Sequence, residues 1–165
     1  MSPANTAPLT TAALGDREIV MTREFDAPRP LVFDAFTKPD LVKKWFLGPE
    51  GWSMPVCEID LKVGGRYRYV WTKEPKGTSM GVSGVYREVS SPARIVHTQR
   101  FDEAWYPGEC VVTTAFEETG GRTTVTMTML FESREARDGV LKSGMESGVA
   151  VSYDRLAEIL KSLGS

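Results

Sequence analysis

The chain is 165 residues long, a length that suits one domain with a substantial core. Hydrophobic residues at 41% and charged residues at 25% are typical of a globular protein in water, and a formal net charge of -2 argues against nucleic acid as a partner. The chain has no apolar run long enough to cross a membrane and no signal-peptide pattern, so we expect a cytoplasmic protein without membrane contact.

The N-terminal segment precedes the first periodic pattern. Residues 1–16 (MSPANTAPLTTAALGD) are expected to form a disordered tail, and residues 17–163 a single domain. That domain opens with residues 17–25 (REIVMTREF), whose β-branched and large side chains predict a strand.

Two short helices are expected after this strand. Asp26 can cap the first, because Pro28 and Pro30 then fall in a first turn that needs no intrahelical N–H donors. The second starts at Pro39, since the residue before a proline is unfavourable for helix, and it ends before Gly48. Neither helix is long enough to bury much surface alone, so both must cover another part of the fold.

A run of strands follows, between Trp52 and Phe131. The dipeptides Gly64-Gly65 and Gly120-Gly121 are hairpin signals, and no helical segment separates the strands, which predicts antiparallel pairing. With the first strand the sheet has about seven strands. The six expected here are residues 52–61, 66–72, 79–89, 94–101, 109–118 and 123–132.

Alternation within these strands predicts one buried face and one wet face. Tyr67, Tyr69 and Trp71 share one side of their strand, whereas Arg66 and Arg68 share the other. The element that covers the buried face is expected to be the last helix of the chain.

That helix is predicted over residues 134–160, with Ser133 as its N-cap. Gly144, Gly148 and Ser152 follow one another at intervals of four and share one edge of it. Each glycine lowers the stability of an exposed helix by about 1 kcal/mol relative to alanine. We therefore expect the small-residue edge to have a structural or functional role. Either a strand backbone approaches this edge closely, or the edge leaves space for another molecule.

Several segments in this order resemble the SRPBCC superfamily, which has the START and birch-pollen-allergen-like helix-grip fold. Within it, the chain is most similar to the C-terminal domain of activators of the heat-shock protein 90 ATPase. The resemblance implies an α+β fold in which a curved antiparallel sheet wraps a long C-terminal helix and two short helices close one end. It is carried by TREFDAPRPLVFDAFTKPDLVKKWF (22–46), GPEGW (48–52), VGGRYRY (63–69), GVYREVSSPARIVHT (84–98) and ARDGVLKSGMESGVAVSYDRL (136–156).

Proteins of this superfamily bind or transform small apolar molecules between the helix and the sheet, or act through protein contacts. One departure from the pattern is Leu47, an extra residue between the aromatic pair and Gly48, which predicts an altered cavity rim. Core packing is the alternative role for every residue of the predicted cavity. The residues expected to line it are Trp45, Phe46, Tyr67, Tyr69, Trp71, His97, Gln99, Met127, Met129, Gly144, Met145, Gly148, Val149 and Ser152.

The sequence offers few candidates for catalytic or metal-binding residues. His97 is the only histidine and the one candidate for a general base, and its strand places it on the same side as Gln99. Cys57 and Cys110 are too few and too far apart for a metal motif or a disulfide framework, so no metal and no cofactor is predicted. Glu58 and Asp60 fit a solvated charged face, and no catalytic constellation is recognisable.

Three functions follow from these features. The first is binding of a small hydrophobic molecule of lipid, polyketide or aromatic type in the predicted cavity, by a monomer or a homodimer. The second, which the resemblance implies, is a co-chaperone in the stress response that stimulates a heat-shock protein 90 homologue by contact. The third is an enzyme of cyclase, dehydratase or hydrolase type that uses the same cavity.

Overall fold

The structure is a computed structural model that describes residues 9–73, 75, 77–103 and 106–163. Its helices and strands follow one another in an α+β arrangement. In chain order they are β1 (Thr10–Leu14), β2 (Glu18–Phe25), α1 (Arg29–Thr37), α2 (Pro39–Trp45), β3 (Trp52–Ile59), β4 (Arg66–Lys73), β5 (Thr78–Ser90), β6 (Arg94–Phe101), β7 (Cys110–Thr119), β8 (Arg122–Leu130), α3 (Arg134–Lys142) and α4 (Met145–Leu163).

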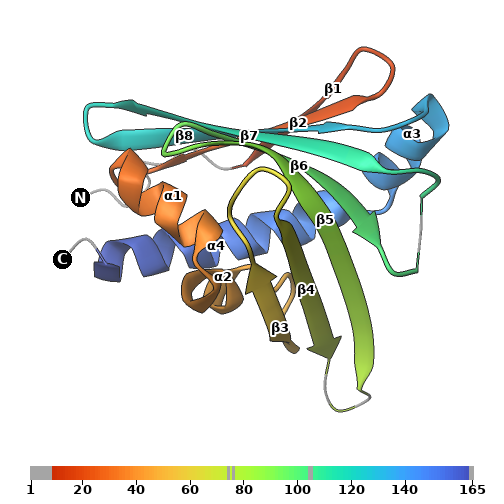
Figure 1. Ribbon diagram of the computed structural model, residues 1–165, viewed down its shortest axis with the longest axis horizontal. Helices are drawn as coiled ribbons and strands as arrows, with labels where there is room; N and C mark the ends of the chain where they lie inside the picture. The colour runs from red at the N-terminus through yellow and green to blue at the C-terminus, as the bar shows by residue number, and fades with distance from the viewer. Residues whose placement is uncertain (1–8, 74, 76, 104–105, 164–165) are drawn as a thin grey trace.

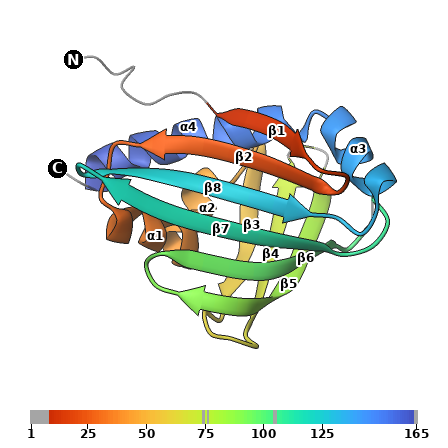
Figure 2. The same cartoon turned by 90° about the horizontal axis from the view of Figure 1, so that it is seen from above.

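A single sheet of eight strands forms the body of the fold, in the order β1-β2-β8-β7-β6-β5-β4-β3, with every neighbouring pair antiparallel. The sheet curves around α4, which runs along its inner side (Figure 1). Seen from above, α1 and α2 lie at one end of α4 and α3 lies at the other (Figure 2). The predicted helix-grip fold is confirmed.

The sheet has one strand more than the sequence predicted. Residues 10–14 were expected to be disordered, yet they form β1, which pairs with β2 from Thr10 opposite Thr22 to Leu14 opposite Glu18. Most side chains of β1 are exposed, so the strand has no alternating burial that a sequence pattern could reveal. Its order comes from backbone pairing with β2. Residues 1–8 of the predicted tail lie outside the described residues.

The predicted C-terminal helix is two helices. Ser133 caps α3 as expected, with its Oγ accepting a hydrogen bond from the N–H of Ala136 at 3.1 Å. The single helix over 134–160 is wrong, because Gly144 has a φ of +80°, a left-handed conformation that ends α3 and allows α4 to start at Met145. Gly144 is therefore a helix terminator and not a member of a helix interior.

The two short helices lie where the sequence placed them. α1 starts after Pro28 with no side-chain cap, so the predicted capping role of Asp26 is wrong. The aromatic rings of Phe33 and Phe36 pack against Phe116 of β7, with ring centroids 5.3 Å apart in both cases. Their contact closes one end of the core. None of the described helices has the length and apolar character needed to cross a bilayer.

Two glycines near the helix break provide a stability test. Replacing Gly144 by alanine forces a side chain into the left-handed region and is expected to lower the free energy of unfolding by about 1–2 kcal/mol. Gly139, inside α3, has open space where a Cβ would stand, so Gly139→Ala is expected to raise that free energy by up to about 1 kcal/mol. Urea unfolding of both variants measures this difference, and equal effects would contradict the assigned role of Gly144.

Candidate functional site

The small-residue edge of α4 faces the connection between α2 and β3. Ser152 is 1% exposed, and its Oγ accepts a hydrogen bond from the N–H of Gly48 at 2.8 Å. A Cβ at Gly148 would lie 3.7 Å from Cδ of Pro49, an ordinary contact. The connection between α2 and β3 therefore lies against this edge at Gly148 and Ser152. Gly144 lies at the break between α3 and α4, and a Cβ added there would have no atom within 4 Å.

The predicted cavity residues at the end of α2 form a joint between three elements. Trp45 is 2% exposed and donates from its indole N–H to the carbonyl of Ala35 at 2.9 Å. The indole N–H of Trp71 donates to the carbonyl of Phe46 at 2.6 Å, and the Phe46 ring meets the Trp71 ring edge-on at 5.4 Å. These three residues hold α2, β4 and the α2–β3 connection together, which is a structural role.

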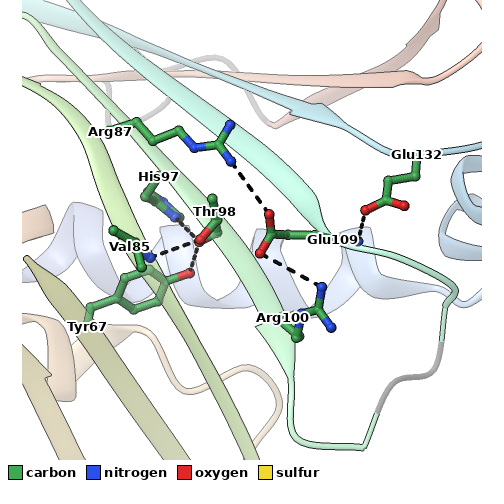
Figure 3. Close-up of polar contacts among 8 residues, drawn as sticks. All are labelled: Tyr67, Val85, Arg87, His97, Thr98, Arg100, Glu109 and Glu132. Carbon is green, nitrogen blue, oxygen red and sulfur yellow. Dashed lines mark hydrogen bonds and ion pairs between the residues drawn. The ribbon is translucent and has the colours of Figure 1, made fainter. Parts of the chain in front are cut away.

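Tyr67 joins β4 to β6 across β5. Its hydroxyl donates to the carbonyl of Thr98 at 2.7 Å, and Figure 3 shows the side chains of Tyr67 and His97 converging on Thr98. Gly84 makes this crossing feasible, because a Cβ there would lie 1.9 Å from the same carbonyl oxygen. The pairing of β5 with β6 is interrupted at this point, and the N–H of Val85 donates instead to Oγ1 of Thr98 at 2.9 Å.

Four tyrosines gather on or beside the inner face of β4 to β6. Burial raises the pKa of Tyr67, Tyr69 and Tyr86 well above the usual value of 10. Burial also raises the pKa of Tyr106 to about 12. All four phenols therefore keep their protons at neutral pH and act as neutral hydrogen-bond donors and acceptors. Tyr69 and Tyr86 hydrogen-bond to each other, which also shifts their pKa values.

His97 lies on the inner side of β6, the side that the sequence predicted. Its Nδ1 is 3.0 Å from the carbonyl oxygen of Thr98, and its ring meets the Tyr67 ring edge-on at a centroid distance of 4.8 Å. Burial lowers the pKa of His97 below the usual value of 6.5, and the hydrogen bond to Thr98 opposes this shift. The imidazole is thus neutral at neutral pH.

The remaining residues of the predicted cavity fall into a buried group and a half-buried group. Met129 (3% exposed) and Val149 (9%) belong to the buried core, as Tyr67 (2%), Tyr69 (9%) and Trp71 (8%) do. Met127, Met145 and Gln99 are half-buried and face the same interior. The amide of Gln99 donates to the hydroxyl of Tyr106 at 3.3 Å.

Tyr86, Thr98 and Tyr106 were missed by the sequence analysis. Tyr86 could have been found, because it shares the inner side of β5 with Val82 and is 3% exposed. Thr98 alternates to the outer side of β6, but its carbonyl is drawn into the site by the interrupted pairing with β5. Tyr106 lies in a connection between strands, where no periodic pattern exists to place it.

A separate pocket of about 310 Å³ lies on the opposite face of the sheet. Arg68 is held there by Asp102 through two hydrogen bonds of 2.9 and 2.7 Å, so their charges are matched. Nearby on this outer face, Glu109 lies between Arg87 and Arg100, at 3.6 and 4.0 Å (Figure 3). This part of the outer face therefore carries solvent-accessible ion pairs. The residues that line the pocket are Glu58, Arg66, Tyr67, Arg68, Ser83 and Gly84.

Metal binding has no support within residues 9–73, 75, 77–103 and 106–163, where no three histidine, cysteine or acidic side chains are grouped to hold an ion. Cys57 and Cys110 are free thiols. Burial raises the pKa of Cys57 to about 11 and that of Cys110 to about 12, so neither is an activated nucleophile.

The bond between Ser152 and Gly48 can be tested on one helix. Ser152→Ala leaves the N–H of Gly48 without its partner and is expected to lower the free energy of unfolding by about 1 kcal/mol. Ser162, on the same helix, is exposed and bonds only to a carbonyl within that helix, so Ser162→Ala is expected to change it by less than about 0.5 kcal/mol. Urea unfolding compares the two, and an unchanged Ser152→Ala protein would show that the bond contributes nothing.

Stability should depend on pH through His97. The folded protein holds a proton on His97 more weakly than the unfolded chain, because burial lowers the folded pKa below 6.5. The free energy of unfolding is therefore expected to fall as pH drops from about 7.5 through 6.5 to about 5, and His97→Gln should remove this part of the dependence. The pKa values of Asp102 and Asp138 lie below the usual 3.8, so their contribution is lost only at more acidic pH. Identical profiles of both proteins above about pH 5 would contradict the assignment.

Comparisons with known proteins agree with this fold. The family model described as "Activator of Hsp90 ATPase homolog 1-like protein" matches residues 26–161. A solved protein from Rhodobacter sphaeroides is 28% identical, covers 94% of this chain and 99% of its own, and superposes with a TM-score of 0.88. One from Staphylococcus epidermidis is also 28% identical, with coverage of 93% and 94% and a TM-score of 0.78.

An AHSA1-like protein from Aeromonas hydrophila, 19% identical with coverage of 86% and 94%, shares the fold with a TM-score of 0.68. No protein with a curated description matches the chain. Since the family model spans most of the sequence and the helix-grip fold is present, the chain belongs to the family of Activator of Hsp90 ATPase homolog 1-like proteins, within the SRPBCC superfamily.

Proposed function

We propose that the protein binds a small, mainly apolar molecule in a hollow between α4 and the inner face of β6 to β8. The proposal rests on the exposure of His97. The strand register places His97 in one row with Ile19, Met129, Val112 and Tyr86. These four residues are 0%, 3%, 2% and 3% exposed, yet His97, between Val112 and Tyr86, is half-buried.

Two further inward residues support the same hollow. Gln99 is half-buried although Cys110, opposite it, is 0% exposed. Met127 is half-buried although its partners Met21 and Thr114 are 1% and 5% exposed. Accessible surface on the covered side of the sheet supports the proposal of unfilled space above it.

The lowered pKa of His97 is consistent with an enclosed space. A ring on an open surface would be hydrated and would keep its ordinary pKa, whereas burial lowers the pKa of this one. Half-burial together with desolvation is what a side chain at the wall of an internal hollow should have. The hollow proposed here lies nearer to β6 and β8 than the edge at Gly148 and Ser152, against which the α2–β3 connection packs.

The side chains around this space suit an apolar molecule with few polar groups. Met127 and Met129 provide flexible, polarizable surface, and His97 and Gln99 provide polar contacts. An aromatic or aliphatic skeleton would be held by buried area and oriented by these two side chains. This is the class of ligand that the sequence favoured.

The other two functions have less support. The imidazole of His97 hydrogen-bonds to a backbone carbonyl, and among the described residues it has no carboxylate or phenol partner for acid–base catalysis. Stimulation of an Hsp90 ATPase is the activity named in the family's description, and no contact among the described residues favours it over ligand binding here. Binding without chemistry is therefore the function that we propose.

Two substitutions on β8 test this function. Met127→Trp should fill the hollow and weaken binding of N-phenyl-1-naphthylamine, an uncharged fluorophore, by about tenfold or more. Thr126→Trp puts the same side chain on the opposite face of the strand, so its affinity should match that of the unmodified protein. A fluorescence titration measures both. Absence of uptake by the unmodified protein, or equal weakening by both substitutions, would overturn the proposal.

A further inference from the structure

The hydrogen bond of His97 defines which of its ring nitrogens carries the proton. A carbonyl oxygen only accepts hydrogen bonds, so Nδ1, 3.0 Å from the carbonyl of Thr98, must be the donor. The same oxygen accepts the hydroxyl of Tyr67 at 2.7 Å, which occupies both of its lone pairs. The neutral ring has one proton, and Nε2 therefore presents a lone pair.

The surroundings of the ring keep it in this form. The rings of Tyr67 and Tyr86 meet the imidazole edge-on, at centroid distances of 4.8 and 5.9 Å. Neither phenol ionises near neutral pH, since burial raises the pKa of both. No acidic side chain of the described residues forms an ion pair with His97, and Arg87 and Arg100 pair with Glu109 on the outer face (Figure 3). A second proton on the ring would thus have no counter-charge.

Nε2 has no protein partner among the described residues. Nε of Arg23 is a nitrogen atom that is buried from solvent and has no hydrogen-bond partner. Nε2 of His97 does not belong to this group, so part of its surface is accessible. An atom that is neither hydrogen-bonded nor sealed borders space that a small molecule can enter. Nε2 is thus an open acceptor of a residue on the inner side of the sheet, where we place the proposed hollow.

Several polar groups beside this hollow already form hydrogen bonds within the protein. Gln99 donates to Tyr106, Tyr67 donates to Thr98, and the hydroxyls of Tyr69 and Tyr86 bond to each other. The buried cation on the inner side of the sheet, Arg23, is paired with Asp154 at 2.8 Å. Nε2 of His97 is the acceptor that these contacts leave open. An anion would meet a lone pair and would lose its hydration without compensation.

Resting on the proposed function, we propose that the ligand is an uncharged molecule with an apolar skeleton and one hydroxyl or N–H group, which donates a hydrogen bond to Nε2 of His97. Phenols and apolar alcohols fit this description, whereas fatty acids and other carboxylates do not. His97 is therefore a specificity-determining residue and not a general base.

Three naphthalene derivatives of one ring size test the inference by titration. We expect 2-naphthol to bind about tenfold more tightly than 2-methoxynaphthalene, which has no donor, and 2-naphthoate to bind more weakly than both. In His97→Phe the preference for 2-naphthol over 2-methoxynaphthalene should disappear while 2-methoxynaphthalene still binds. Gln99→Met, a change at the neighbouring inward position, should keep the preference.

A second measurement does not depend on a variant that folds. Because the chain has one histidine, its ring nitrogen signals in ¹⁵N NMR need no assignment. We expect the pattern of a neutral ring protonated at Nδ1, and a shift of the Nε2 signal when 2-naphthol is added but not when 2-methoxynaphthalene is added. Equal binding of all three compounds, or a proton on Nε2 in the free protein, would overturn the inference and leave ligand binding standing. Failure of all three to bind would overturn the proposed function itself.

Discussion

The contact on which the rest of the structure depends is that between α4 and the connection from α2 to β3. Ser152 accepts a hydrogen bond from Gly48 and Trp71 donates one to Phe46, so this short connection is bonded to both the helix and the sheet. Pro49 of the same connection lies close to Gly148 of the helix. One end of the grip is thereby closed by backbone and side-chain packing.

The surroundings of His97 determine the protonation state of its ring. The imidazole lies in a row of buried apolar and aromatic side chains, is desolvated, and is oriented by a carbonyl that also holds Tyr67. Its environment therefore favours a neutral ring with a lone pair toward the interior. A histidine poised for proton transfer would need a carboxylate behind it, as in a catalytic dyad. The same residue type thus acts here as an acceptor because of what surrounds it.

Much of the fold could be predicted from the sequence, because it depends on local patterns. The alternation of Tyr67, Tyr69 and Trp71 predicted the buried side of β4, and all three are at most 9% exposed. Ser133 predicted the start of α3, since a capping side chain bonds to a backbone N–H three residues away. The break at Gly144 was missed because a glycine in a helical pattern has the same spacing whether it continues the helix or ends it. Only its φ distinguishes the two.

The sequence by itself determined the class of fold, the inner faces of the strands and the inward position of His97, since these follow from periodicities of two and 3.6 residues along the chain. The tertiary structure alone decided what each inner residue meets. Ser152 and Gly48 are 104 residues apart, and β1 owes its order to β2 and not to a pattern of its own. His97 and the buried residues beside it come from five different strands, and they line up only when four strand pairings have formed. Such contacts join distant parts of the chain, and no local pattern encodes them.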